Sequence, residues 1–432
     1  PRLFTDAGVC SAGEGWLVER AIYGLRESPN AWGKERDSFL RTLEIDLQGM
    51  PIRLKQSITD PCLRFIQAKP VEMLKKKIPI QIRAIVVSFL GSVTLGVLIA
   101  YVDDLLAAAE QALTRKLLNA VRRKWKCGEI DSAEEKSVVF LSVRVTRMVD
   151  GSYQLDQTDY VQDVLDRNEM SKATGLTALQ WPEEEAEAPS YEPDILSELV
   201  LTAQRFAGEL LWLSQRTRPD LAFGVNAACA SAVTKPEQSV VVSKAIMRFL
   251  VGRPNLALTY YSMPATEKHL EAFAQEYNAQ PLSEMAEEDA IVGFSDSSFA
   301  NGLETQSFGA FGIVLAGGLV SWKCGKQRIK SESTAESELL AACETHTATL
   351  SLRTMLSEMF PIQVCRVTLA IDNAATIALI RANGPANWRT RHLRIRAAVI
   401  SETINDRNMM VKHCPGVVEL ADLMTKQLPA PR

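Results

Sequence analysis

The sequence is poor in the residues that structural zinc sites and disulfide frameworks need. Its eight cysteines are scattered along 432 residues without a C-x-x-C pair, and only four histidines are present. Zinc modules require closely spaced Cys and His ligands, and disulfide-bonded folds require a high density of cysteine. We therefore expect free thiols, as in a reducing compartment, and neither a zinc module nor a set of disulfides.

The chain also lacks a net positive charge. It has 48 Lys and Arg against 52 Asp and Glu, a net charge of -4, which taken whole argues against a nucleic-acid-binding protein. Two segments account for this balance, because residues 181–200 carry seven acidic and no basic side chains, and residues 264–290 carry seven acidic side chains and only Lys268. The rest of the chain has a net charge of +9. We expect the two acidic segments to be linkers.

No uninterrupted apolar run of membrane-spanning length is present. Residues 84–102 carry no charge, but the run is rich in Val and Ile, is broken by Gly91 and Gly96, and leads into Asp103 and Asp104. β-Branched runs bounded by glycine are typical of buried strands rather than of a membrane helix. We therefore expect two buried strands joined by a turn, and no contact with a membrane.

What is present has the length and composition of several globular domains. The linkers divide the chain into residues 1–180, 201–263 and 291–432. The middle part predicts helices over 201–215 and 235–250, with a break at Arg218 and Pro219. The last part predicts strands at 291–296, 309–316, 319–324, 367–372 and 409–413, and helices at 333–359, 374–382, 394–405 and 419–427. The order βββαβα, a further helix and βα predicts a mixed sheet.

Four acidic residues of the last part lie in or at the ends of these elements: Asp296, Glu338, Asp372 and Asp422. Side chains at strand ends and on neighbouring helices can converge on one point of such a sheet. Carboxylates gathered there would repel unless a cation lay among them, and two Mg²⁺ ions about 3.5–4 Å apart suit hydrolysis of a phosphodiester. Spacing alone leaves the alternative open that these are solvated carboxylates.

The motifs around these acids are GFSDSSFANG, STAESELLA, IDNAA and LADLMTK, and they resemble the ribonuclease H domain of copia-type LTR retrotransposons. The resemblance implies that Asp296, Glu338, Asp372 and Asp422 are catalytic and bind two Mg²⁺ ions, with Mn²⁺ as a substitute. Glu336 competes with Glu338 for the place of the helix ligand. The Leu-Leu-Ala that follows Glu338 matches the family pattern and favours Glu338.

Three upstream motifs resemble the reverse transcriptase of the same elements. They are AIYGLRESPNAW at 21–32, SITDPCLRF at 57–65 and IAYVDDLLAAA at 99–109. The resemblance implies that Asp103 and Asp104 bind catalytic metal on a tight turn between apolar strands. It also implies a nucleotide and template site lined by Tyr23, Gly24, Arg26, Ser28, Pro29 and Tyr101.

The reverse-transcriptase motifs depart from the family in two places. The family carries a further catalytic acid upstream of YGLRESPNAW, and residues 1–20 offer only Asp6, in a context that does not match. Glu27 stands where the family has Gln and adds negative charge near the template. We therefore expect that this chain, which begins without Met and looks like a piece of a longer polyprotein, does not polymerise DNA by itself.

Three basic clusters predict contacts with nucleic acid, although each has the alternative of a solvated face. The first is Arg115, Lys116, Arg122, Arg123, Lys124 and Lys126, on a predicted helix with Trp125. The second is Lys323, Lys326, Arg328 and Lys330, and the third is Arg389, Arg391, Arg394 and Arg396 around His392. Of these, we expect Lys326, Arg328, Arg391 and His392 to contact nucleic acid, with packing as the alternative for His392.

The resemblance covers nearly the whole chain and predicts an α+β and α/β multidomain protein. We expect a partial reverse-transcriptase palm and thumb without fingers (1–180), a helical connection (201–263) and a ribonuclease H-like domain (291–432). The partners would be RNA/DNA hybrid, template-primer and the upstream part of the polyprotein, in cytoplasmic virus-like particles and the nucleus. The expected activity is Mg²⁺-dependent hydrolysis of the RNA strand of hybrids. The alternative is a decayed or co-opted fragment that binds nucleic acid without catalysis.

Overall fold

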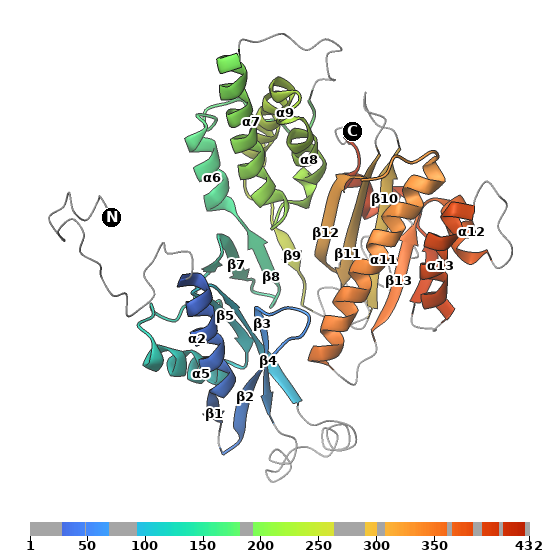
Figure 1. Cartoon of the computed structure of the whole chain (residues 1–432). Helices are drawn as coiled ribbons and strands as arrows, with labels where there is room; N and C mark the ends of the chain where they lie inside the picture. Colours follow the sequence, from blue (N-terminus) through green and yellow to red (C-terminus); the bar gives the residue numbers. More distant parts are fainter. Residues whose placement is uncertain are drawn as a thin grey trace, which may run out of the picture. The chain divides into compact units, whose positions relative to one another are not determined.

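The chain forms two compact units, residues 1–128 and 129–432, in a computed structural model (Figure 1). The structure describes residues 28–47, 49–68, 93–181, 193–262, 290–299, 307–360, 365–382, 391–405 and 409–427. Within these ranges, no helix combines the length and the apolar character needed to cross a membrane.

The first unit is an antiparallel sheet with two helices on one face. The strands run in the order β1 (Glu44–Asp46), β2 (Pro51–Gln56), β3 (Leu63–Ala68), β4 (Val93–Tyr101) and β5 (Asp104–Ala109). Helices α2 (Ser28–Thr42) and α5 (Gln111–Lys124) pack against it through a core that includes Leu40, Ile66, Leu98 and Leu117. Strand β4 is the second of the two strands expected in residues 84–102, and residues 84–92 lie outside the described ranges.

The second unit begins with a small antiparallel sheet and a group of helices. The sheet has the order β6 (Val138–Phe140), β7 (Val143–Arg147), β8 (Tyr153–Asp156) and β9 (Leu258–Tyr260). The helices are α6 (Thr158–Arg167), α7 (Pro193–Ser214), α8 (Ala222–Ser231) and α9 (Pro236–Gly252). Val161, Val164 and Leu165 of α6 lie in one core with α7, α8 and α9. Residues 129–180 therefore belong to this unit and not to the first, whereas the sequence predicted a division at residue 180.

Helix α7 begins inside the segment that was expected to be a linker. It starts at Pro193, eight residues before the expected helix, and Asp194 lies in its first turn. Proline suits the start of a helix because its missing N–H needs no acceptor there, and an acidic side chain is stabilised by the helix dipole. Residues 182–192 of the segment, and residues 263–289 of the other expected linker, are outside the described part of the chain.

The break between α7 and α8 is fixed by a buried arginine. The Arg218 side chain is 2% exposed, donates to Asp220 at 2.8 Å and to the Arg253 carbonyl at 3.1 Å. A buried guanidinium needs such partners because an unpaired buried charge is costly. These contacts place Arg218 in the packing between helices.

The remainder of the second unit is a five-stranded mixed sheet. Its order is β12 (Gly318–Lys326), β11 (Phe308–Leu315), β10 (Ala290–Ser298), β13 (Arg366–Ile371) and β14 (Met409–His413). β10, β11 and β12 pair antiparallel, whereas β13 pairs parallel with both β10 and β14. Helices α11 (Thr334–Met359), α12 (Ala374–Arg381) and α13 (Arg391–Asn405) pack in one core on this sheet. The predicted order of strands and helices is therefore confirmed up to β14.

The last predicted helix, 419–427, was wrong. Two short 3₁₀ turns occur there instead, η4 (Gly416–Val418) and η5 (Leu420–Met424). The N–H groups of Asp422 and Thr425 bond to carbonyls three residues back, the pattern of a 3₁₀ helix, which is used in short pieces. This tight winding brings the side chains of Asp422 and Thr425 to the edge of the sheet.

The other face of the mixed sheet is covered by the helical part of the same unit. Phe223 of α8 packs in one core with Phe294 of β10, Val314 of β11 and Met424 of η5. The Trp322 indole N–H donates to the Ser214 carbonyl at 2.7 Å, and the Tyr260 hydroxyl donates to the Leu319 carbonyl at 2.8 Å. The helices and the mixed sheet therefore share a core and fold as one unit.

Candidate active site

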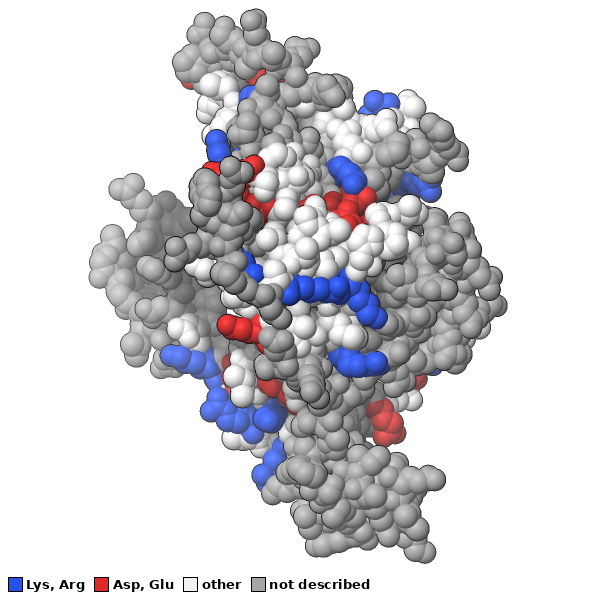
Figure 2. Space-filling model, turned by 90° about the vertical axis from the view of Figure 1, so that its right-hand side faces the viewer, with Lys and Arg blue, Asp and Glu red and all other residues white. Residues whose placement is uncertain are grey.

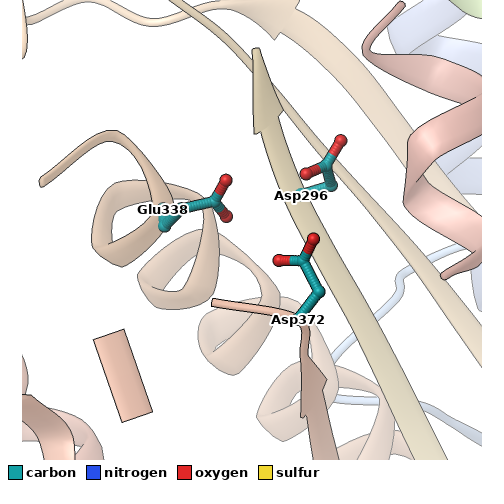
Figure 3. Close-up of side chains that lie close together, drawn as sticks. All are labelled: Asp296, Glu338 and Asp372. Carbon is teal, nitrogen blue, oxygen red and sulfur yellow. The ribbon is translucent and has the colours of Figure 1, made fainter. Parts of the chain in front are cut away.

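Three carboxylates from three elements meet at one end of the mixed sheet. Asp296 lies in β10, Glu338 in α11 and Asp372 directly after β13, and one oxygen of each lies within 4.8 Å of the others. Figure 3 shows the three carboxylates pointing toward one another. Among the described residues this is the one group of three metal-binding side chains at such spacing. The structure therefore assembles three of the four predicted acids.

The register of the sheet and a glycine explain this convergence. Ser295 pairs with Ile371 in the parallel ladder between β10 and β13, so that Asp296 and Asp372 follow at the same level. Gly293 lets α11 approach the sheet, because a Cβ atom there would lie 2.7 Å from the methyl groups of Thr345 and Thr349. Close packing of α11 brings Glu338 to the strand ends.

Glu338, rather than Glu336, belongs to the cluster. The Glu336 carboxylate accepts the Glu332 N–H at 2.8 Å and lies 3.5 Å from the Arg396 guanidinium. Residues two apart on a helix face roughly opposite sides. The Glu338 carboxylate instead accepts the Ser297 N–H at 3.3 Å, on the strand that carries Asp296. The two acids of STAESELLA therefore have different surroundings.

The cluster is buried, and burial shifts its titration. Asp296 and Glu338 are each 4% exposed. Burial, with the charge of Asp422, raises the pKa of Asp296 to about 6, and burial with the charges of Asp296 and Asp372 raises the pKa of Glu338 to about 8. Burial and Asp422 also raise the pKa of Asp372. Each shift reflects a site that resists holding several negative charges without a compensating positive one.

Two buried oxygens of the cluster lack hydrogen-bond partners within the described part of the chain. They are Oε2 of Glu338 and Oδ1 of Asp372. Buried carboxylate oxygens without a partner are costly and rare unless a cation or water satisfies them. Carboxylate oxygens are also the ligands that hard divalent cations prefer. The residues of the cluster therefore fit a divalent cation.

Asp422, the fourth predicted acid, lies next to Asp296 but outside the group of three closely spaced acids. Its Oδ1 is 2.6 Å from the Lys426 ammonium, one turn further along the chain. Asp422 nevertheless contributes charge to both Asp296 and Asp372. The pairing with Lys426 offsets part of the negative charge at this edge.

Two polar residues that the sequence did not single out adjoin the cluster. The Thr425 hydroxyl donates to Oδ2 of Asp296, and Thr425 is fully buried. Glu419 is 4% exposed and accepts the Ala421 N–H at 3.2 Å, and burial with the charges of Asp296 and Asp372 raises its pKa well above the usual range. Both lie near Asp422 in the segment ELADLMTK. The polar residues of that motif were the only sequence feature that could have pointed to them.

The second acidic site lies on the β4–β5 hairpin of the first unit. Tyr101 pairs with Asp104, leaving Val102 and Asp103 as a two-residue turn. Val102 has a positive φ of 49°, unusual for a β-branched residue. Asp103 and Asp104 are exposed, and no third acid of the described residues completes a group with them. The expected tight turn is confirmed, without a cage of carboxylates.

Helix α2 holds this turn through a carbonyl. The indole N–H of Trp32 and the guanidinium of Arg36 each donate to the Val102 carbonyl at 2.8 Å. Trp32, the last residue of YGLRESPNAW, therefore contacts the YVDD turn. Ser28 and Pro29 begin α2, whereas the predicted site residues Tyr23, Gly24 and Arg26, together with Asp6 and Glu27, lie outside the described residues.

The first basic cluster is partly engaged within its own unit. On α5, Lys116 donates to the Asp46 carbonyl at 3.2 Å, and Lys124 lies 3.7 Å from Glu35. Trp125 packs edge-on against Trp32 and Phe39. This tryptophan therefore belongs to the packing of α2 against α5.

The second basic cluster lies along a groove between β12 and α11. The groove has a volume of about 680 Å³, with Lys323, Lys326 and Arg328 among its lining residues. Gln327, between the two predicted contacts, also lines the groove and donates to the Ser337 carbonyl at 2.9 Å. The carboxylates of the cluster are not among the residues that line this groove, although both features adjoin α11. Figure 2 shows Lys and Arg side chains in separate groups on the face that it displays.

The third basic cluster is only partly described. Arg394 donates to the Ala382 carbonyl at 2.5 Å, and Arg396 lies beside Glu336 and also lines the groove. Arg389 and the side chains of Arg391 and His392 lie outside the described part, so that these two predicted contacts stay predictions.

The chain is similar in sequence to transposon polyproteins, although no family model matches it. It is 20% identical over 95% of its length to the retrovirus-related Pol polyprotein from transposon TNT 1-94 of Nicotiana tabacum, and 23% identical over 95% to that from transposon RE1 of Arabidopsis thaliana. Over 76% of its length it is 20% identical to the truncated transposon Ty1-A Gag-Pol polyprotein of Saccharomyces cerevisiae. The chain spans only 27%, 24% and 27% of these relatives. Its curated homologues are therefore Pol polyproteins of Ty1/copia-type transposons.

Two kinds of solved structure align with the chain. RNase H1 from Halobacterium salinarum aligns with 31% of the chain and 93% of its own length, at 14% identity and a TM-score of 0.25. The foamy viral protease-reverse transcriptase in complex with RNA/DNA hybrid aligns with 90% of the chain and 42% of its own length, at 12% identity and a TM-score of 0.39.

Proposed function

We propose that the chain is a reverse transcriptase and ribonuclease H portion of a transposon Pol polyprotein, and that its mixed-sheet part hydrolyses the RNA strand of RNA/DNA hybrids. The observation that carries this proposal is the group formed by Asp296, Glu338 and Asp372, which is buried, closely spaced and short of hydrogen-bond donors. Such a group is costly as a structural element alone, because Lys426, which pairs with Asp422, offsets only part of the negative charge. A role in binding cations explains why the fold maintains it.

Asp296, Glu338 and Asp372 would hold Mg²⁺, with Mn²⁺ as a substitute, and Asp422 would add negative charge from the side. A bound divalent cation supplies positive charge that polarises a phosphoryl oxygen and favours ionisation of water. The chain itself orients the ligands. Ser297 holds Glu338 through its N–H, and Thr425 holds Asp296 through its hydroxyl.

The groove along α11 supports a nucleic-acid substrate. Lys326 and Arg328 line it and can neutralise phosphate groups. Hybrid recognition would depend on helix shape and 2′-hydroxyl contacts rather than on base edges. Cleavage should therefore be tolerant of sequence and should weaken as salt is added.

We also propose that the first unit of this chain does not polymerise DNA by itself. Asp103 and Asp104 stand on an exposed turn without a third acid among the described residues. Metal-dependent phosphoryl transfer needs ligands that fix the cations against the triphosphate. Incubation of the chain with template-primer, nucleotides and Mg²⁺ should give no extension, and extension would contradict this proposal.

The nuclease assignment is tested with the full chain and a hybrid whose RNA strand is labelled at its 5′ end. In Mg²⁺ the chain should release short RNA products from the hybrid and leave single-stranded RNA of the same sequence intact. Asp372→Asn should abolish the products without reducing hybrid binding. A chain that binds the hybrid but never cleaves it would instead favour the alternative of a non-catalytic binding fragment.

A further inference from the structure

We infer that Thr425 is a positioning residue, whose hydroxyl orients the Asp296 carboxylate for cation binding. The inference rests on the proposed function and extends it to a residue outside the carboxylate group. Thr425 lies 129 residues from Asp296 in the chain and belongs to the turn that follows η5. Its hydroxyl reaches the strand end because the 3₁₀ winding directs it there.

The hydroxyl proton has two acceptors within reach, and only one can take it. Thr425 Oγ1 lies next to Oδ2 of Asp296 and 3.2 Å from the Asp422 carbonyl. That carbonyl already accepts the backbone N–H of Thr425 at 3.2 Å. A carboxylate is also the stronger acceptor of the two. The proton therefore belongs to the bond with Asp296.

This bond fixes one oxygen of the Asp296 carboxylate, because Oδ2 accepts the Thr425 hydroxyl. Asp296 also supplies an oxygen to the group that it forms with Glu338 and Asp372, and the Asp422 carboxylate lies next to it. Repulsion among these acids favours rotation of the Asp296 side chain away from the group. A fixed donor to Oδ2 resists that rotation, and ligand partners of this kind orient metal-binding carboxylates generally.

The turn that carries Thr425 is itself anchored, so that it can serve as a fixed donor. Thr425 is fully buried, and Ala421 and Met424 of η5 lie in the core that includes Phe294 of β10. At the start of η5, the Glu419 carboxylate accepts the Ala421 N–H. The hydroxyl is therefore held at a set distance from β10 by packing on both sides.

Substitution can separate a positioning role from a merely structural one. Thr425→Val keeps the shape of the side chain and the backbone bonds of the turn but removes the donor, whereas Thr425→Ser keeps the donor. Thr345→Val is the matched control in the same unit. Thr345 is also fully buried and its hydroxyl donates at 2.8 Å, but to the Ala341 carbonyl of its own helix and not to a carboxylate.

The experiment measures Mn²⁺ binding to the full chain by electron paramagnetic resonance and, separately, hybrid cleavage as a function of Mg²⁺ concentration. Thr425→Val should weaken Mn²⁺ binding by about 10- to 100-fold and raise the half-saturating Mg²⁺ concentration similarly, with the rate largely restored at saturating Mg²⁺. Thr425→Ser should restore affinity to within about threefold of the unsubstituted chain, and Thr345→Val should leave it unchanged.

The outcomes separate this inference from the function on which it rests. If the unsubstituted chain binds Mn²⁺ and Thr425→Val binds it equally well, the positioning role is wrong and the proposed function stands. Equal losses in Thr425→Val and Thr345→Val would also overturn the inference, because they would reflect the cost of any buried hydroxyl. If the unsubstituted chain binds no Mn²⁺, the inference and the proposed function both fail.

Discussion

The two acidic sites of the chain differ in how their carboxylates are brought together. Asp103 and Asp104 are neighbours in the sequence and stand on an exposed hairpin turn, whose Val102 carbonyl accepts hydrogen bonds from Trp32 and Arg36. Asp296, Glu338 and Asp372 come from three elements and are gathered in a buried site with unpaired oxygens. Two exposed acids on a turn cost little free energy because water solvates their charges. Burying three acids from separate elements in one place is costly. The second arrangement is therefore much stronger support for a cation site.

The comparison first predicts which acids control nuclease activity. Asp296→Asn should reduce hybrid cleavage by on the order of 100-fold or more, because it removes one charge from the cage that binds the cation. The double substitution Asp103→Asn and Asp104→Asn should leave cleavage unchanged, since the hairpin belongs to the other unit. Both are measured with the same labelled hybrid in Mg²⁺. Loss of cleavage in the hairpin variant would show that Asp103 and Asp104 also contribute to nuclease activity.

Cation binding should stabilise one unit and not the other. At a Mg²⁺ concentration 100 times the dissociation constant, a site present only in the folded state gains about 2.7 kcal/mol. Calorimetry should therefore show that Mg²⁺ raises the unfolding temperature of residues 129–432 and that chelation reverses the rise. The transition of residues 1–128 should not move. An equal shift of both transitions would indicate non-specific binding to acidic surfaces.

The packing of α11 on the sheet can be tested with a pair of glycines. Gly293→Ala would place a methyl 2.7 Å from Thr345 and Thr349, whereas Gly325→Ala on β12 meets nothing within 4 Å. The first change should cost about 1–3 kcal/mol of unfolding free energy and slow cleavage, since it displaces the helix that carries Glu338. The second should be close to neutral for unfolding free energy. Denaturant unfolding compares the two variants, and hybrid cleavage is measured for Gly293→Ala. Equal effects would mean that α11 does not need this close approach.

The smallest effect concerns the hairpin turn. Trp32→Phe keeps an aromatic ring against Trp125 but removes one of the two donors to the Val102 carbonyl. Because Arg36 still donates to that carbonyl, the first unit should lose only about 0.5–1.5 kcal/mol of unfolding free energy. Hybrid cleavage should be unaffected. A change in cleavage would show that the two sites are coupled.

Much of the mixed-sheet part was predictable because its information is local. Apolar runs bounded by glycines gave β10, β11 and β12, and the motif around each acid pointed to Asp296, Glu338 and Asp372. The resemblance also favoured Glu338 over Glu336, in agreement with their observed surroundings. These features depend on periodicity and motif, which a sequence displays directly.

The features that could not be predicted from the sequence depend on contacts between distant segments. The core shared by Phe223 and Phe294, and the bond between Thr425 and Asp296, join residues 71 and 129 positions apart. The expected division at residue 180 and the expected helix at 419–427 were replaced because tertiary packing outweighed local pattern. The start of α7 at Pro193 was missed because acidic composition was taken as a sign of a linker.

Two acids on one helix can show whether the buried carboxylate group is a cation-dependent nuclease site. Glu336 and Glu338 are both buried on α11, but only Glu338 belongs to the group. The measurement is the rate of hybrid cleavage by Glu338→Gln and by Glu336→Gln in saturating Mg²⁺. We predict that Glu338→Gln loses cleavage by on the order of 100-fold or more, whereas Glu336→Gln stays within about tenfold of the unsubstituted chain. Equal rates in the two variants would contradict the assignment.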